Sequence, residues 1–269
     1  MNDSVAIVCD KEKDVEDEGR YLYCVVEMGE KRIFSKFGVD EEDVYTIPYG
    51  DISGVVHRCL PKPYQSDDHE LVKKWLFQHQ QVVGFFFEGY DAVLPFPFDT
   101  IIKGGNADAD EKVRNWLKEE YSNLRRKMEK VRGKQEFGVQ IFWYPRSITD
   151  ELKNESVEAQ RMLNEIASKP RGVAYMYEQK LKDVMKKELE AKAEKYSQEF
   201  YSIIRSHVDD VKIEKIPKAD GDKQMIMNLS CLISKDRVQE LGRELDKINT
   251  IPNISVRFTG PWPAYSFMT

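Results

Sequence analysis

Apolar positions in the first hundred residues follow the pattern of β-strands and one helix. The β-branched and aromatic run 21–27 predicts a strand, and the runs 44–48 and 52–58 predict two more with the turn 48–51 between them. Apolar side chains spaced three and four residues apart predict a helix over 69–83. The chain is therefore expected to begin as a small sheet followed by a helix.

A very apolar stretch interrupted by prolines comes after that helix. It runs from Phe85 to Phe98 and includes Pro95 and Pro97. Because each proline fixes φ and removes a backbone donor, we predict a sheet edge or an irregular buried strand here. A second helix is predicted over 111–131.

The second half returns to a strand at 136–144 and then becomes mostly helical. A helical pattern at 150–167 is broken by Pro170 and Gly172, and a longer one covers 173–206. At 1.5 Å per residue, about 30 residues form a rod about 45 Å long. Such a helix is longer than is required to cover one face of a small sheet.

Two strands, a helix and a last strand complete the pattern. The strands 210–216 and 224–233 are joined by a turn at 218–222, and the helix 238–249 precedes the strand 254–258. The order strand, helix, strand, strand, helix, strand is that of a ferredoxin-like βαββαβ unit.

We therefore predict an α+β protein with two domains. The C-terminal domain, 134–258, is expected to be ferredoxin-like with an enlarged helical insert at 150–206. The N-terminal domain, 20–133, is expected to be a smaller, modified ferredoxin-like α+β unit. Residues 1–19 are charged and predict a flexible lead-in, and the tail 259–269 is expected to pack back on the body.

The composition is that of a globular chain and argues against two kinds of partner. The 269 residues are 41% hydrophobic and 33% charged, and 41 Lys and Arg against 47 Asp and Glu give a net charge of −6. An acidic chain that lacks the signature of RNA-binding strands is not expected to bind nucleic acid. No apolar run is long enough to predict membrane insertion, and scattered cysteines favour a reducing cytoplasm.

Motifs of catalysis and cofactor binding are missing from the sequence. It contains no glycine-rich nucleotide loop, no nucleophile elbow and no HExxH zinc motif. The segment around Asp108 and Asp110 resembles a calcium loop without its glycine and bidentate glutamate, so helix capping is the better interpretation. We predict no enzyme activity, no catalytic residue, no metal site and no cofactor. The histidines are too spread for a metal site: His57, His69, His79 and His207.

The tail combines prolines and aromatics directly after a predicted strand. One interpretation is a rigid structural segment whose aromatics fill a groove between the domains, and the other is a docking surface. Trp and Tyr rarely stay exposed, which favours the structural interpretation. The residues of this pattern are Gly260, Pro261, Trp262, Pro263, Tyr265 and Phe267.

The string FTGPWPAYSF in this tail resembles the closing signature of the gas vesicle protein GvpF/GvpL family. The resemblance covers about 20–269. Two positions depart from the family pattern. Asp99 stands where a glycine usually follows the phenylalanine of the LPxxF motif, and Ala264 stands where another proline usually follows the second proline of the tail. Weaker matches occur in order as YLY at 21–23, PYGDISGVV at 48–56, His79 before LPFPF at 94–98, EFGV at 136–139 and GVAY at 172–175.

The resemblance implies a non-enzymatic accessory protein of gas vesicle assembly, located at the gas vesicle in the cytoplasm and acting as an assembly factor or a minor vesicle component. Its implied partners are the hydrophobic shell subunit and other accessory proteins. The apolar content of 85–98 and the length of the helix 173–206 make both segments candidates for the partner surface. The candidate residues are Phe85, Phe86, Phe87, Phe96, Phe98, Tyr177, Leu181, Tyr196 and Phe200.

Two other functions remain open from the residues alone. A regulatory protein would use ferredoxin-like domains to bind a small molecule at a sheet interface, and an enzyme would carry a site without a known motif. Neighbouring vesicle genes would favour the assembly role, and neighbouring metabolic genes would favour the regulator. A pocket with perturbed carboxylates would favour the enzyme.

Overall fold

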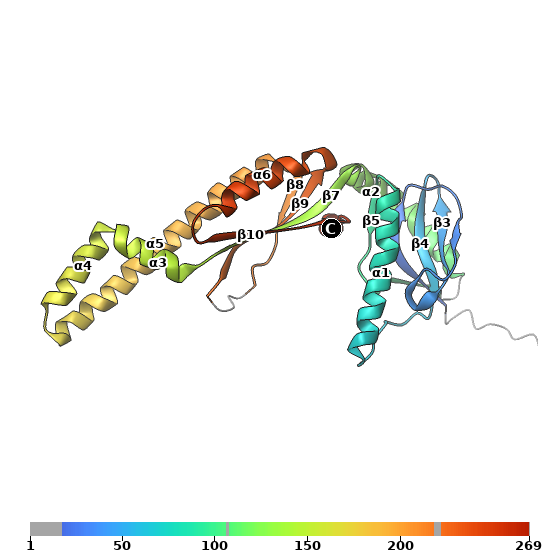
Figure 1. The fold of residues 1–269 in the computed structure, drawn as a ribbon. Helices are drawn as coiled ribbons and strands as arrows, with labels where there is room; N and C mark the ends of the chain where they lie inside the picture. Colours follow the sequence, from blue (N-terminus) through green and yellow to red (C-terminus); the bar gives the residue numbers. More distant parts are fainter. Residues whose placement is uncertain (1–17, 106–107, 218–221, 269) are drawn as a thin grey trace, which may run out of the picture. The chain divides into compact units, whose positions relative to one another are not determined.

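The computed structural model describes residues 18–105, 108–217 and 222–268, which form two compact units with two antiparallel sheets and six α-helices (Figure 1). Unit 1 contains the described residues up to Arg132 and those from Pro263 onward, and unit 2 contains Gly133 to Trp262. The chain therefore passes between the units twice. Most of the predicted lead-in and of the predicted turn at 218–222 lies outside the described residues.

The sheet of unit 1 is centred on β1, which pairs with β4 on one side and with β5 and β6 on the other. The strand order is β2-β3-β4-β1-β5, and all pairs are antiparallel. The predicted sheet edge in the proline-rich stretch is found at β5. The strands are β1 (Gly19–Val26), β2 (Ile33–Phe34), β3 (Val44–Tyr49), β4 (Ile52–Cys59), β5 (Val93–Pro95) and β6 (Ile101–Lys103).

Two helices cover opposite faces of this sheet. Tyr23 of β1 shares a buried core with Phe86 of α1, so α1 lies on the face of Tyr23. On the other face, a Cβ added to Gly54 of β4 would lie 3.3 Å from Cγ1 of Val113 in α2, so this glycine allows α2 to pack closely. The helices of unit 1 are α1 (His69–Gly89), α2 (Ala109–Val131) and the short 3-10 helices η2 (Val39–Glu41) and η4 (Tyr265–Met268).

Helix α1 is longer than the predicted 69–83, because it continues to Gly89 and takes in the three phenylalanines that suggested a strand. Phe86 follows Val82 by one helical turn and joins the same buried core, whereas Phe85 stays exposed. The strand prediction was therefore wrong for 85–89. Continuing the helix places Phe86 on the same face of α1 as Val82, where its ring is buried.

Unit 2 is built on a four-stranded antiparallel sheet in the order β10-β7-β9-β8. Its core contains Val139 and Leu229 of the sheet, Phe200 and Ile204 of α5, and Leu245 of α6. The elements are β7 (Lys134–Trp143), α3 (Pro145–Glu155), α4 (Val157–Ser168), α5 (Arg171–Ser206), β8 (Asp210–Ile213), β9 (Gln224–Ser234), η3 (Lys235–Arg237), α6 (Val238–Asn249) and β10 (Ile254–Trp262).

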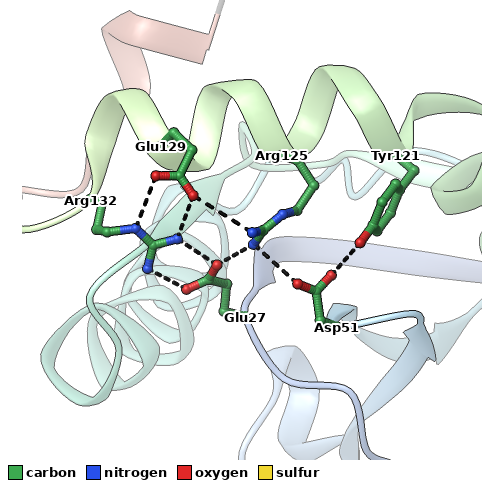
Figure 2. A network of polar contacts seen from close by, with 6 residues as sticks. All are labelled: Glu27, Asp51, Tyr121, Arg125, Glu129 and Arg132. Atoms are coloured by element: carbon green, nitrogen blue, oxygen red, sulfur yellow. Dashed lines mark hydrogen bonds and ion pairs between the residues drawn. The ribbon is translucent and has the colours of Figure 1, made fainter.

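A network of ion pairs fastens the end of β1 to the last turns of α2 (Figure 2). Glu27 accepts hydrogen bonds from Nη1 of Arg132 at 2.5 Å and from Nη2 at 2.6 Å, and it also accepts one from Arg125. The bonds from Arg132 and then those from Arg125 lower the pKa of Glu27 to about 2. The carboxylate thus stays ionised and links two arginines that lie two turns apart on α2.

The same network reaches the turn between β3 and β4 (Figure 2). Arg125 lies 3.3 Å from a carboxylate oxygen of Asp51, and the hydroxyl of Tyr121 donates to the other oxygen at 2.6 Å. Helix α2 is therefore held at three points, by its packing on the sheet, by Glu27 and by this turn.

We expect Glu27→Gln to lower the free energy of opening β1 and α2 by about 1–2 kcal/mol, because two guanidinium groups lose their shared partly buried carboxylate. Hydrogen exchange of peptides from β1 and α2 measures this opening. Glu30→Gln is the matched control, since its pair with Arg32 is exposed and exposed pairs contribute little. Equal protection in both variants would contradict a fastening role for Glu27.

Candidate functional site

The most distinctive addition to the sheet of unit 2 is a helical arm, which we define as α3, α4 and residues 171–189 of α5. Pro145 stands in the first turn of α3, and the hydroxyl of Ser156 accepts a bond from the backbone N–H of Ala159 at the start of α4. Pro170 precedes α5 directly. In Figure 1, α3, α4 and the first half of α5 extend beyond the four strands.

Helix α5 serves two separate cores. Phe200 and Ile204, near its C-terminal end, are buried against the sheet. Leu181 and Met185, about three to four turns from its start, belong instead to a small cluster with Ala159 of α4. With 36 residues at 1.5 Å each, α5 is about 54 Å long, so its first half lies outside the sheet's core.

An open groove of about 600 Å³ lies along the arm. Its floor is apolar and comes from α4 and α5, while its charged rim contains three lysines and one glutamate. The apolar lining residues are Leu163, Ile166, Leu181, Met185 and Leu189, and the others are Thr149, Lys153, Glu178, Lys182 and Lys186. Recessed apolar side chains within a charged rim are the usual anatomy of a protein-binding groove.

The start of α5 exposes further apolar side chains. Tyr175 and Met176 are each 61% exposed, and Val173 is also exposed. Solvent-exposed large side chains are ordinary singly, and these three lie on the arm outside the residues that line the groove.

The four α5 residues predicted for a partner surface lie in different environments. Leu181 lines the groove, and Tyr177 is half-buried one turn before it. Tyr196 stacks on Phe200 with ring centroids 5.2 Å apart, and Phe200 is buried in the core of unit 2. The side chain of Phe200 therefore stabilises the sheet and faces no solvent.

The predicted phenylalanines of unit 1 are similarly divided. Phe86 is fully buried and Phe85 is 49% exposed, with its ring edge-on to Phe34 and Phe37. Phe87 is half-buried. Phe96 packs edge-on to Trp116 of α2, and Phe98 packs edge-on to Tyr21 and Tyr64.

The tail after β10 packs on unit 1. Phe267 is 2% exposed and lies beneath the ammonium group of Lys130, whose nitrogen is 5.3 Å from the ring centroid. The hydroxyl of Tyr265 accepts a hydrogen bond from the side chain of Gln80 at 3.3 Å and lies 3.4 Å from Nε2 of His79. Pro263 is also buried.

The preceding part of the tail pattern belongs to strand β10. Gly260 has φ +131, and an added Cβ would lie 2.7 Å from the ring of Phe137 and 2.9 Å from the carbonyl oxygen of Glu136. Only glycine fits this position without displacing backbone. Pro261 is exposed, and Trp262 is 52% exposed.

Two buried histidines are hydrogen-bonded to tyrosines inside unit 1. Nδ1 of His79 lies 2.9 Å from the hydroxyl of Tyr21, and Nδ1 of His57 lies 2.7 Å from the hydroxyl of Tyr23. Nε2 of His57 lies 2.9 Å from the hydroxyl of Tyr64. Each ring nitrogen of His57 therefore has a tyrosine hydroxyl as its hydrogen-bond partner. This arrangement favours a structural role for His57 over proton transfer to a substrate.

Burial keeps both histidines neutral. It lowers the pKa of His57 to about 3, with a smaller contribution from His79, and it lowers the pKa of His79 to about 4. Burial also raises the pKa values of Tyr21 and Tyr23, so their hydroxyls remain protonated donors.

Asp99 occupies the position where the family pattern usually has glycine, and its φ of 69 is in the left-handed region. Aspartate tolerates this region better than most residues. Its backbone N–H donates to the hydroxyl of Tyr21 at 3.0 Å, and its carboxylate accepts from the backbone N–H of Tyr64 at 2.9 Å. The departure is therefore accommodated by contacts to the tyrosines of the same cluster.

Sequence reasoning missed the groove and the histidine–tyrosine cluster. The helical spacing of Leu181, Met185 and Leu189 signals an apolar face, but it does not show which helix packs beside it. In the sequence, the only indication of the histidine–tyrosine cluster is that Tyr21 and Tyr23 alternate in one strand and so share one face of the sheet.

Within the described ranges, no group of three or more His, Cys, Asp or Glu side chains is arranged to hold a metal ion. Over the same ranges, none of the helices combines the length and the apolar character needed to cross a membrane.

Comparison with known sequences decides the family. A sequence model of the family described as gas vesicle synthesis protein GvpL/GvpF matches residues 19–269. The chain belongs to this family. The match extends over nearly the whole chain and confirms the resemblance that the tail carries.

Two named gas vesicle proteins are similar to this chain over most of its length. Gas vesicle protein L1 of Halobacterium salinarum is 29% identical over 259 residues, covering 93% of this chain and 90% of that protein. Gas vesicle protein L of Haloferax mediterranei is 26% identical over 297 residues, covering 96% of this chain and 89% of that protein. These names connect the chain with gas vesicles.

Solved structures of the family share the fold. Gas vesicle protein GvpF from Anabaena sp. PCC7120 superimposes with a TM-score of 0.74 at 18% identity, covering 94% of this chain and 98% of that one. GvpF from Microcystis aeruginosa superimposes with a TM-score of 0.66 at 16% identity, covering 93% and 99%. The mixed arrangement of two sheets and six helices described above is therefore similar to that of GvpF.

We expect unit 1 to lose stability in acid as its histidines become protonated in the unfolded chain. The pKa of each is below its unfolded value near 6.5, so the stabilisation is complete above that pH and falls as the pH drops toward 4 for His79 and 3 for His57. At pH 5 the expected loss is about 2 kcal/mol per histidine. Hydrogen exchange of β1 and β4 at pH 7.5 and pH 5, corrected for intrinsic rates, measures it.

The control for this pH dependence is a pair of single variants. His79→Gln should reduce the loss of stability between pH 7.5 and pH 5 by about half, because His57 still contributes. His69→Gln should leave the profile unchanged because His69 is exposed. Parallel profiles in the wild type and His79→Gln would refute the assignment.

Proposed function

We propose that this chain is an accessory protein of gas vesicle assembly that binds the hydrophobic shell subunit, other accessory proteins, or both. The observation that carries the proposal is the apolar groove of the helical arm. Its floor residues Leu181 and Met185 belong to the small cluster with Ala159, and Leu189 at its end also packs against the core that stabilises the sheet. A hydrophobic subunit that polymerises with itself needs its apolar surface covered before ordered growth, and the arm offers a surface for that purpose.

We propose further that unit 2 is a ferredoxin-like domain and that the arm is its enlarged first crossover. The element order from β7 to β10, with three helices before β8 and one after β9, supports this interpretation, as does the antiparallel sheet order β10-β7-β9-β8. Unit 1, with β5 and β6 both on β1, would be a modified relative of this design.

A second partner surface is proposed on α1 in unit 1. Phe77 and Phe85 are 65% and 49% exposed, and Phe85 adjoins the rings of Phe34 and Phe37. We assign this surface a secondary role, because its exposed phenylalanines form no part of the groove on which the proposal rests.

We expect Leu163→Glu combined with Met176→Glu to reduce capture of the co-expressed shell subunit at least about tenfold, because charge in an apolar contact costs more than 1.4 kcal/mol. Both side chains are partly or mostly exposed, so the fold should survive. Pull-down of shell subunit with the tagged full chain measures the effect.

The matched control carries Phe77→Glu and Phe85→Glu on α1. If the α1 control still captures the shell subunit and the arm variant does not, the result supports the arm as the binding site. Loss in the control alone would transfer the binding site to α1, and failure of the wild type to capture any shell subunit would refute direct shell binding.

We propose that the tail is mainly structural, and a comparison of Phe267 with Trp262 tests this. Phe267→Ala should destabilise unit 1 by about 3 kcal/mol, because it removes a buried aromatic side chain. Trp262→Ala should change stability much less, since that side chain is half exposed. Hydrogen exchange of α2 and η4 measures the first effect, and hydrogen exchange of β7 and β10 measures the second. Loss of shell capture in Trp262→Ala at unchanged stability would instead make the tail a docking surface.

A further inference from the structure

The floor of the arm groove has the spacing of a helix-binding surface. Leu181, Met185 and Leu189 follow one another by one turn along α5 and span about 12 Å, while Leu163 and Ile166 contribute from α4. An amphipathic helix presents its apolar side chains at the same one-turn spacing, so two or three of them would match this floor.

The rim of the groove is basic although the chain as a whole carries a net charge of −6. Lys182 and Lys186 stand one turn apart on α5, and Lys182 makes no ion pair with any described residue. Lys186 lies 3.9 Å from Glu190, and Lys153 lies 3.0 Å from Asp150. These exposed pairs within a helix are weak, so carboxylates of a partner would compete for the same lysines.

Two other kinds of occupant fit the groove less well. A small molecule is usually oriented by a few convergent polar groups, but the hydroxyl of Thr149 already donates to the carbonyl oxygen of Pro145. A bilayer surface would contact protruding apolar side chains. Tyr175 and Met176 protrude from the arm but do not line the groove, whose floor residues Leu181 and Met185 are recessed, at 8% and 4% exposure.

We propose that this groove binds an amphipathic helix of a partner protein whose apolar anchors, one turn apart, are flanked by Asp or Glu residues. The inference rests on the proposed function, because it specifies the chemistry of the segment that would occupy the same surface. The apolar anchors fill the floor, and the acidic flanks pair with Lys182, Lys186 and Lys153.

Designed peptides test the proposal with the full-length chain. The probe is a fluorescent helical peptide of alanine and glutamate with leucines at positions i, i+4 and i+8, and its binding is followed by fluorescence anisotropy. A second peptide has lysine in place of every glutamate, and a third has the leucines distributed around the helix. We expect the acidic peptide to bind at least about tenfold more tightly than either of the others.

Charge reversal of lysines at the rim of the groove tests whether they bind the glutamates of the acidic peptide. Lys182→Glu with Lys186→Glu should weaken the acidic peptide about tenfold or more and strengthen the lysine peptide. The matched control is Lys187→Glu with Lys195→Glu, which makes the same charge change at exposed positions outside the groove and should preserve the preference. Leu163→Glu should weaken the acidic peptide in the same assay.

Three results would overturn the proposal. These are equal binding of the acidic and lysine peptides, equal effects of the two charge reversals, and binding of phosphatidylglycerol vesicles without binding of the acidic peptide. Shell capture that depends on Leu163 in the absence of any peptide preference would leave the proposed function standing and refute this inference. A charge-dependent peptide preference without shell capture would leave this inference standing and refute direct shell binding.

Discussion

The continuity of α5 is the constraint on which the proposed binding surface depends. One helix of 36 residues places Phe200 and Ile204 in the core of unit 2 and, several turns earlier, places Leu181 and Met185 under the groove. A helix without a kink curves only gently along its length. The packing of the C-terminal half of α5 on the sheet therefore also sets the position of its first half, which carries the groove. The small cluster around Ala159 then has only to hold α4 against a rod that is already in place.

Unit 1 differs from unit 2 in that its core contains several buried polar side chains. Tyr21, Tyr23, His57 and His79 each have a hydrogen-bonding partner within the cluster, so their burial does not leave unsatisfied groups. The ion pairs around Glu27 act at the other face, where α2 ends (Figure 2). Polar contacts thus supply much of the specificity with which unit 1 joins its helices to its sheet.

Much of the local structure was predictable because it depends on neighbours in sequence. The central strands and the long helix follow from alternation and helical spacing. A cap of α2 by Asp108 or Asp110 follows from side-chain bonds within a few residues, and the structure has Asp108 in that role. The prediction for 85–89 failed because three adjacent phenylalanines carry no period of their own. Whether they continue α1 depended on the core that receives Phe86.

The sequence by itself determined the family, through the tail and its ordered matches, and in the second half of the chain it determined the order strand, helices, strand, strand, helix, strand. Only the tertiary structure decided which aromatic side chains remain exposed, which unit receives the tail, and where a groove forms. The reason is physical, because each of these depends on contacts between distant residues. Tyr265 and His79, for example, are 186 positions apart, and no local pattern predicts that they meet.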